Sequence, residues 1–122
     1  MNEANARAGF RLSADGGIHL AGLPEVFAGD SLRPWLAPTG FLDSDSPAVR
    51  EFVAQAIEGE SDARGKAVRL FYAVRDRIRY DPYRISFDPI QYRASSVLAA
   101  GYGWCVPKAV LLAACARAAG IP

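Results

Sequence analysis

The segment from Val106 to Ala119 constrains the fold more than any other part of this sequence, because it is a helix-length run with apolar residues on nearly every side. Only Lys108 and Arg117 carry a charge within it. A helix that is apolar all round must be covered nearly all round, so we expect it at the centre of a domain. Pro107 fits such a helix in the first turn, where its missing N–H has no partner to lose.

Two cysteines occupy contrasting positions on this expected helix. Cys105 stands at its start, where unpaired backbone N–H groups and the positive end of the helix dipole favour thiolate over thiol. Cys105 is therefore a candidate nucleophile, although a free cysteine is often only a small buried residue. Cys115 lies more than two turns further on and is expected to be a packing residue. Roughly 15 Å of helix axis separates the two, too far for a disulfide.

Residues 101–122 read GYGWCVPKAVLLAACARAAGIP. They resemble the core motif of the transglutaminase-like superfamily of papain-fold cysteine enzymes, in which Gly-x-Cys opens a helix that runs to Gly-Ile-Pro. The matching positions are Gly103, Cys105, Ala109, Leu111, Ala114, Ala116, Arg117, Gly120, Ile121 and Pro122. Residues 36–50 and 67–80 also resemble the bacterial members that carry Trp-Cys-Val-Pro-Lys at the nucleophile, so the resemblance covers about residues 36–122.

The resemblance implies acyl transfer through a thioester on Cys105, with a peptide or protein carboxamide as substrate and no cofactor. The backbone N–H of Cys105 is a candidate oxyanion donor, since it is among the free amides at the helix start. Gln91, Tyr92 and Trp104 are candidates for a second donor or for the substrate cleft. Protease, amidase and transglutaminase share this first step, and the sequence does not separate them. The alternative is a noncatalytic helical interaction or scaffold domain that retains the cysteine helix.

The resemblance also implies a catalytic histidine, then an aspartate or its equivalent, on strands that follow Gly-Ile-Pro. His19 is the single histidine; it lies in a segment that does not match the family and is expected to be a surface or loop residue. We therefore expect residues 36–122 to be the mostly helical front half of an α+β domain, truncated before its sheet and inactive alone. Residues 1–35 are expected to be an N-terminal extension. Without the sheet, the apolar helix predicts a homo-oligomer.

Two amphipathic helices are expected ahead of the cysteine helix. Ser46 is a helix cap and Pro47 suits the first helical position. An apolar stripe follows before Gly59 ends the helix: Val49, Phe52, Val53, Ala56 and Ile57. A second helix is expected to begin near Ser61 with Asp62 in its first turn and to stop before Asp81-Pro82. Its expected apolar face consists of Ala67, Leu70, Phe71, Val74 and Ile78.

The remaining segments read as connections. Residues 29–46 and 81–93 are expected to be loops, and the rings in the second, Tyr80, Tyr83, Phe87 and Tyr92, are expected to cap the core. Ser95 is expected to cap a short helix through Ala100, with Gly101 as its left-handed exit. A hairpin around residues 15–17, Asp-Gly-Gly, is possible on turn chemistry.

Composition excludes several functional classes. A net charge of +1 provides no electrostatic footprint for nucleic acid or an anionic membrane. No window has the roughly 18 consecutive apolar residues of a transmembrane helix, and we expect a cytoplasmic protein. One histidine and two distant cysteines cannot make a zinc site, so no metal is expected.

Overall fold

The structure, a computed structural model, describes residues 10–12, 18–20 and 32–122. The chain divides into two compact units, residues 1–32 and 33–122, which are described separately. In the first unit, β1 (Phe10–Leu12) pairs antiparallel with β2 (Ile18–Leu20), and Arg11 lies opposite His19. The expected strand pairing is thus present, whereas the expected turn residues 15–17 lie outside the described residues. His19 belongs to a strand and not to a loop.

The second unit is mostly helical, which confirms the expected fold class. Its α2 (Pro47–Ala56) begins as the sequence predicts: the Ser46 side chain accepts a hydrogen bond from the Val49 amide at 3.3 Å, and Pro47 takes the first position. Val49, Phe52 and Val53 are buried. Gly59, just beyond the helix, adopts a φ of 75°, a left-handed conformation that glycine reaches without steric cost.

Helix α3 (Ala63–Arg77) differs from the predicted helix in where it begins, where it ends and which of its residues are buried. Asp62 precedes the helix as its N-cap and accepts from the Gly65 amide at 3.0 Å. The helix ends at Arg77 because the next residues turn into strand β3 (Arg79–Tyr80). The buried stripe is narrower than predicted and consists of Leu70, Val74 and Ile78.

Ala67 and Phe71 are exposed, so their assignment to the apolar face of α3 was wrong. Phe71 lies about 100° around the helix from Leu70, outside the strip at i, i+4 and i+8 that is buried. It instead makes an edge-to-face ring contact with Tyr72, with the ring centroids 5.8 Å apart.

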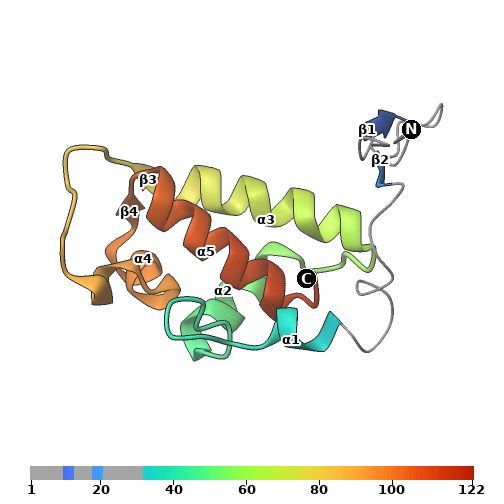
Figure 1. Cartoon of the computed structure of the whole chain (residues 1–122), viewed down its shortest axis with the longest axis horizontal. Helices are drawn as coiled ribbons and strands as arrows, with labels where there is room; N and C mark the ends of the chain where they lie inside the picture. The colour runs from blue at the N-terminus through green and yellow to red at the C-terminus, as the bar shows by residue number, and fades with distance from the viewer. Residues whose placement is uncertain (1–9, 13–17, 21–31) are drawn as a thin grey trace, which may run out of the picture. The chain divides into compact units, whose positions relative to one another are not determined.

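Both segments expected to be loops contain a short helical turn. In the first, α1 (Arg33–Leu36) is a single turn with Pro34 near its start. In the second, η3 (Pro89–Tyr92) is a 3₁₀ turn capped by the Asp88 side chain. The prediction that the rings of this loop cap the core was wrong for three of them, since Tyr80, Tyr83 and Phe87 are 58%, 94% and 96% exposed. The loop bows away from the helices in Figure 1.

Helix α4 (Ala94–Ala100) is capped from a distance. Ser95 is not its cap, as the sequence had suggested; the Ser95 amide instead donates to the buried Asp43 carboxylate at 3.1 Å. Asp43 thereby fixes the loop before α2 to the start of α4. Gly101 ends α4 with a φ of 72°, the left-handed exit that the sequence predicts.

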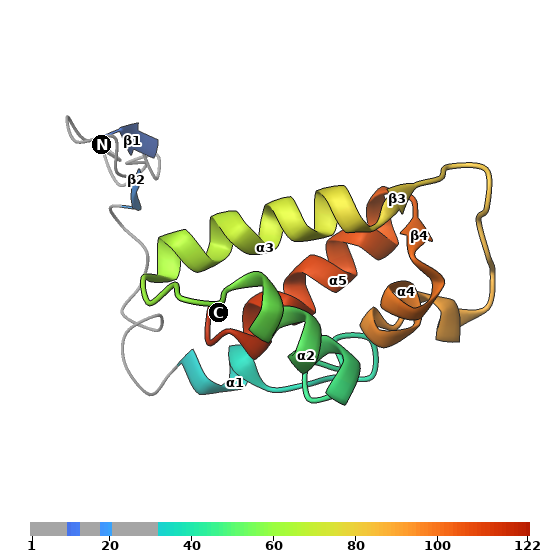
Figure 2. The same ribbon diagram turned by 180° about the vertical axis from the view of Figure 1, so that it is seen from behind.

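Helix α5 (Cys105–Ala118) is the centre of this unit and contacts α2, α3 and α4. Figures 1 and 2 show α3 along one side of it and α2 and α4 along the other. Its buried residues are Pro107, Leu111, Ala114 and Cys115. The expectation of near-complete cover is corrected, because Cys105, Val106, Ala109, Ala113 and Ala118 are exposed. Self-association through this face stays a prediction.

A short parallel pairing joins the residues after α3 to those before α5. Strand β3 pairs with β4 (Tyr102–Gly103), with Arg79 opposite Tyr102 and Tyr80 opposite Gly103. Backbone hydrogen bonds of 3.0 Å run from the Arg79 amide to the Gly101 carbonyl and from the Asp81 amide to the Gly103 carbonyl. Among the described residues, no helix is long and apolar enough to cross a membrane.

Candidate functional site

Cys105 is the first residue of α5, and its thiol is exposed. Trp104 occupies the N-cap with an extended backbone and makes no side-chain cap hydrogen bond. The N-caps of α2 and α3, Ser46 and Asp62, each accept from an amide of their own first turn. Since the Trp104 side chain offers no such acceptor, the backbone amides of Cys105 and Val106, which lack intrahelical partners, can donate to a ligand beside the thiol.

Close packing fixes the path of the chain into Cys105. Gly103 is buried, and a Cβ added to it would lie 3.1 Å from Cγ of Pro107. That distance is too short for a side chain unless the proline ring moves. Gly103 and Pro107 therefore form a tightly packed pair on either side of Cys105.

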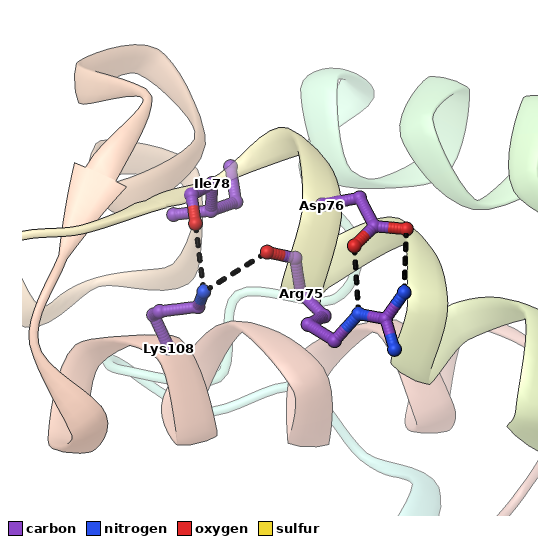
Figure 3. Close-up of polar contacts among 4 residues, drawn as sticks. All are labelled: Arg75, Asp76, Ile78 and Lys108. Carbon is purple, nitrogen blue, oxygen red and sulfur yellow. Dashed lines mark hydrogen bonds and ion pairs between the residues drawn. The ribbon is translucent and has the colours of Figure 1, made fainter.

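Lys108 ties the first turn of α5 to the end of α3. Its ammonium group donates to the Ile78 carbonyl at 2.7 Å and to the Arg75 carbonyl at 3.3 Å, as Figure 3 shows. These carbonyls lie at the C-terminal end of α3, where backbone acceptors lack intrahelical partners and a cation is favourable. Arg75 itself pairs with Asp76. Sequence reasoning did not single out Lys108; the signal was a lone lysine within an otherwise apolar helix start.

The three cleft candidates named from the sequence lie together. Gln91, Tyr92 and Trp104 line one small cavity of about 50 Å3, which Arg84 and Tyr102 also line. The Tyr92 and Trp104 rings meet edge to face, with centroids 6.3 Å apart and an angle of 88° between the planes. The Tyr92 hydroxyl donates to the Ser86 carbonyl at 2.7 Å, so this proton is engaged within the loop. Gln91 and Trp104 remain candidates for a second oxyanion donor.

An apolar groove of about 580 Å3 lies along the other flank of Tyr92. We call it the apolar groove; its lining residues are Phe41, Leu42, Ser86, Phe87, Pro89, Tyr92, Val106 and Val110. Val106 follows Cys105 directly and Val110 lies one turn further along α5. The apolar groove therefore reaches the residue that follows Cys105, and it has the mainly apolar lining typical of ligand sites.

Cys115 differs from Cys105 in every respect that bears on reactivity. It is fully buried among apolar residues of the core, as predicted. Burial disfavours the charged thiolate and raises the pKa of Cys115 from 9.0 to about 12. Cys115 is thus a packing residue.

No group of three or more histidine, cysteine, aspartate or glutamate side chains in residues 10–12, 18–20 and 32–122 could hold a metal ion. The only histidine in the sequence, His19, lies in β2 of the first unit. The second unit therefore offers a thiol and helix-start amides, but no imidazole.

Comparison with known protein families adds one finding. A family model described as the transglutaminase-like superfamily matches residues 50–122. The match spans most of α2 and all of α3, α4 and α5, and so includes Cys105. No curated protein and no solved structure matches the chain.

Proposed function

The chain belongs to the transglutaminase-like superfamily, and from this premise we propose that Cys105 is the nucleophile of a cysteine acyltransferase or hydrolase. The observation that carries the proposal is the exposed thiol at the first position of α5, next to an N-cap whose side chain accepts no hydrogen bond from the helix. The positive end of the helix dipole favours a negative charge at a helix start, and the free amides there are hydrogen-bond donors at the same point. Both are requirements of covalent acyl transfer.

The proposed substrate is a peptide or protein carboxamide. The Cys105 thiolate adds to the carbonyl carbon and forms a C–S bond, while the carbonyl oxygen takes up negative charge that the Cys105 amide stabilises. The C–N bond then breaks, and the amine leaves with a proton from a general acid. Water or a second amine displaces the sulfur from the thioester and takes the acyl group.

The apolar groove supports a peptide as the acyl donor. It starts at Val106 and continues past Val110 on one side and Phe87 on the other. An extended substrate whose carbonyl lies at Cys105 would place its neighbouring apolar side chains against these residues. Burial of such side chains contributes roughly 25 cal/mol per Å2 of apolar surface removed from water.

The resemblance implies a histidine as the general acid of this mechanism, and the second unit contains no histidine. His19 lies in the first unit, in a segment outside the family match. We also propose a reducing cellular compartment, consistent with two free thiols.

The test is acylation by a substrate whose leaving group needs no protonation. Mixed with p-nitrophenyl acetate, the chain should release a burst of one equivalent of nitrophenolate and carry one acetyl group on Cys105, as located by mass spectrometry. Cys105→Ser should abolish the burst, whereas Cys115→Ser should retain it. Acetylation spread over other residues, or an equal burst from Cys105→Ser, would contradict the proposal and favour a noncatalytic domain.

A further inference from the structure

Two arginines share one carboxylate, and one of them, Arg84, lines the small cavity that Trp104 also lines. Arg79 Nη2 lies 3.3 Å from Asp81 Oδ2, and Arg84 Nε lies 3.4 Å from the same oxygen. The other carboxylate oxygen of Asp81 accepts from the Tyr83 amide at 3.1 Å. One negative charge therefore faces two positive charges, and this cluster keeps an excess of one positive charge.

The Tyr102 ring orients both guanidinium groups. The Arg84 guanidinium carbon lies 4.9 Å from the ring centroid and that of Arg79 lies 5.9 Å away, both within cation–π range. Tyr102 belongs to β4, three residues before Cys105. The short strand that leads into the nucleophile therefore also positions the two arginines.

Arg84 faces the same cavity as the residues that flank Cys105. Gly103, Trp104 and Pro107 line this cavity together with Arg84 and Gln91. Its volume of about 50 Å3 is small, enough for a group of a few atoms such as a carboxylate. A guanidinium fork matches a carboxylate in shape and charge, and Gln91 adds an amide donor.

Other arginines of the second unit are engaged differently. Arg75 forms a one-to-one pair with Asp76, and Arg93 and Arg117 donate to the backbone carbonyls of Gly40 and Ala37. Those contacts hold elements together. Arg84 and Arg79 are distinguished by their shared acid, and Arg84 also by lining a cavity together with Gly103 and Trp104, the two residues before Cys105.

We propose that this cavity binds a carboxylate of the substrate on Arg84, so that the preferred acyl donor carries a negative charge close to the amide that is attacked. The inference rests on the proposed function, since it takes Cys105 as the point of attack. It narrows the substrate class from any carboxamide to acidic ones.

The test compares two alkylating reagents of the same chemistry and different charge. In both reactions the Cys105 thiolate displaces iodide from a methylene carbon and forms a C–S bond; iodoacetate carries a carboxylate, and iodoacetamide carries a neutral amide. The measured quantity is the ratio of the two rate constants at Cys105, followed by mass spectrometry. Because any change in thiolate population affects both rates equally, the ratio reports the anion preference alone.

Arg84→Gln should lower the iodoacetate-to-iodoacetamide ratio by about threefold to tenfold, a range typical of local electrostatic attraction of a charged reagent. Arg84→Lys should lower the ratio less than Arg84→Gln does, since lysine retains the positive charge but lacks the planar guanidinium group. The ratio of the unchanged chain should fall as salt screens the attraction. The matched control is Arg64→Gln, which removes the same charge at the far end of α3 and should leave the ratio unchanged.

An equal ratio in Arg84→Gln and Arg64→Gln, with rapid alkylation by iodoacetamide, would overturn this inference and leave the proposed function standing. Failure of Cys105 to react with either reagent would overturn the proposed function and this inference with it.

Discussion

The first and third turns of α5 place the same side chain in opposite environments. Cys105 is exposed at a helix start without a side-chain cap, whereas Cys115 is fully buried in the core formed with α2, α3 and α4. Burial raises the pKa of Cys115 to about 12. One helix thus provides a candidate nucleophile and an inert packing residue, and the difference comes from position alone.

Cys105 and Cys115 also differ in what determines their surroundings, which is the local motif for Cys105 and the packing of the fold for Cys115. The position of Cys105 is a property of the motif, since a glycine two residues before and a proline two residues after fix the chain around it. The environment of Cys115 is a property of the fold, because other helices, α2, α3 and α4 among them, pack around this one. A change at the first turn should affect chemistry, and a change at the third turn should affect stability.

The largest expected effect is the difference in thiol reactivity. A pKa near 12 leaves Cys115 with about a thousandfold less thiolate at neutral pH than a thiol of pKa 9.0. Timed alkylation with iodoacetamide, read by mass spectrometry, should therefore label Cys105 at least about a hundredfold faster than Cys115. Equal labelling, or faster labelling of Cys115, would remove the contrast on which the candidate site depends.

The next effect concerns the two sides of α5. Leu111 is fully buried, so Leu111→Ala should lower the free energy of unfolding by about 3 kcal/mol, through lost transfer energy and the cavity left behind. Val106 is 44% exposed, and Val106→Ala should cost well under about 1 kcal/mol. Urea denaturation followed by circular dichroism measures both. Similar losses for the two variants would mean that the exposed side of α5 is covered in solution.

The smallest effect is a pH dependence. The folded protein holds the Cys115 proton up to a pKa of about 12, while the unfolded chain releases it near 9.0. The contribution is therefore fully present below pH 9 and is lost as the pH rises toward 12, by up to about 1.4 kcal/mol per pH unit. Urea denaturation between pH 8 and pH 10.5 should show a shallower decline for Cys115→Ala than for the unchanged chain. Cys105→Ala serves as the matched control, because it removes an exposed thiol. If Cys105→Ala showed the same shallow decline with pH as Cys115→Ala, the assignment of this pH dependence to Cys115 would be wrong.

Local signals made α2 predictable. Its cap at Ser46, its proline at position 47 and its apolar spacing all indicate the same helix, and the structure has it. The face of α3 was less predictable because its sequence has more large apolar residues than its contact with the core can bury. Packing against α5 decided in favour of Leu70 over Phe71. The cap of α4 was unpredictable, since Asp43 lies 52 residues away in the sequence.

The residues of the candidate site likewise divide into those that a local sequence pattern indicates and those that depend on contacts within the fold. The motif predicts Cys105 as the nucleophile, which stays a prediction, and the other candidates Gln91, Tyr92 and Trp104 line one cavity. The contacts of Lys108 with the Ile78 carbonyl and of Arg84 with the Tyr102 ring join segments that are far apart in the sequence, so no local pattern encodes them. What the sequence did not indicate was therefore the set of long-range contacts near Cys105.

Because β3 pairs with β4, unfolding of the loop of residues 82–93 need not involve unfolding of the helices. The two 3.0 Å backbone bonds at Arg79 and Asp81 hold one end of this loop, and α4 holds the other. Tyr83 and Phe87 are almost fully exposed, so the segment between them buries little apolar surface. Segments with few buried contacts open at a lower free energy than the core around them. We therefore expect Arg84 and Ser86, which line the small cavity, to become exposed by local unfolding at a lower free energy than α5, so that Cys105 keeps its place while the cavity opens.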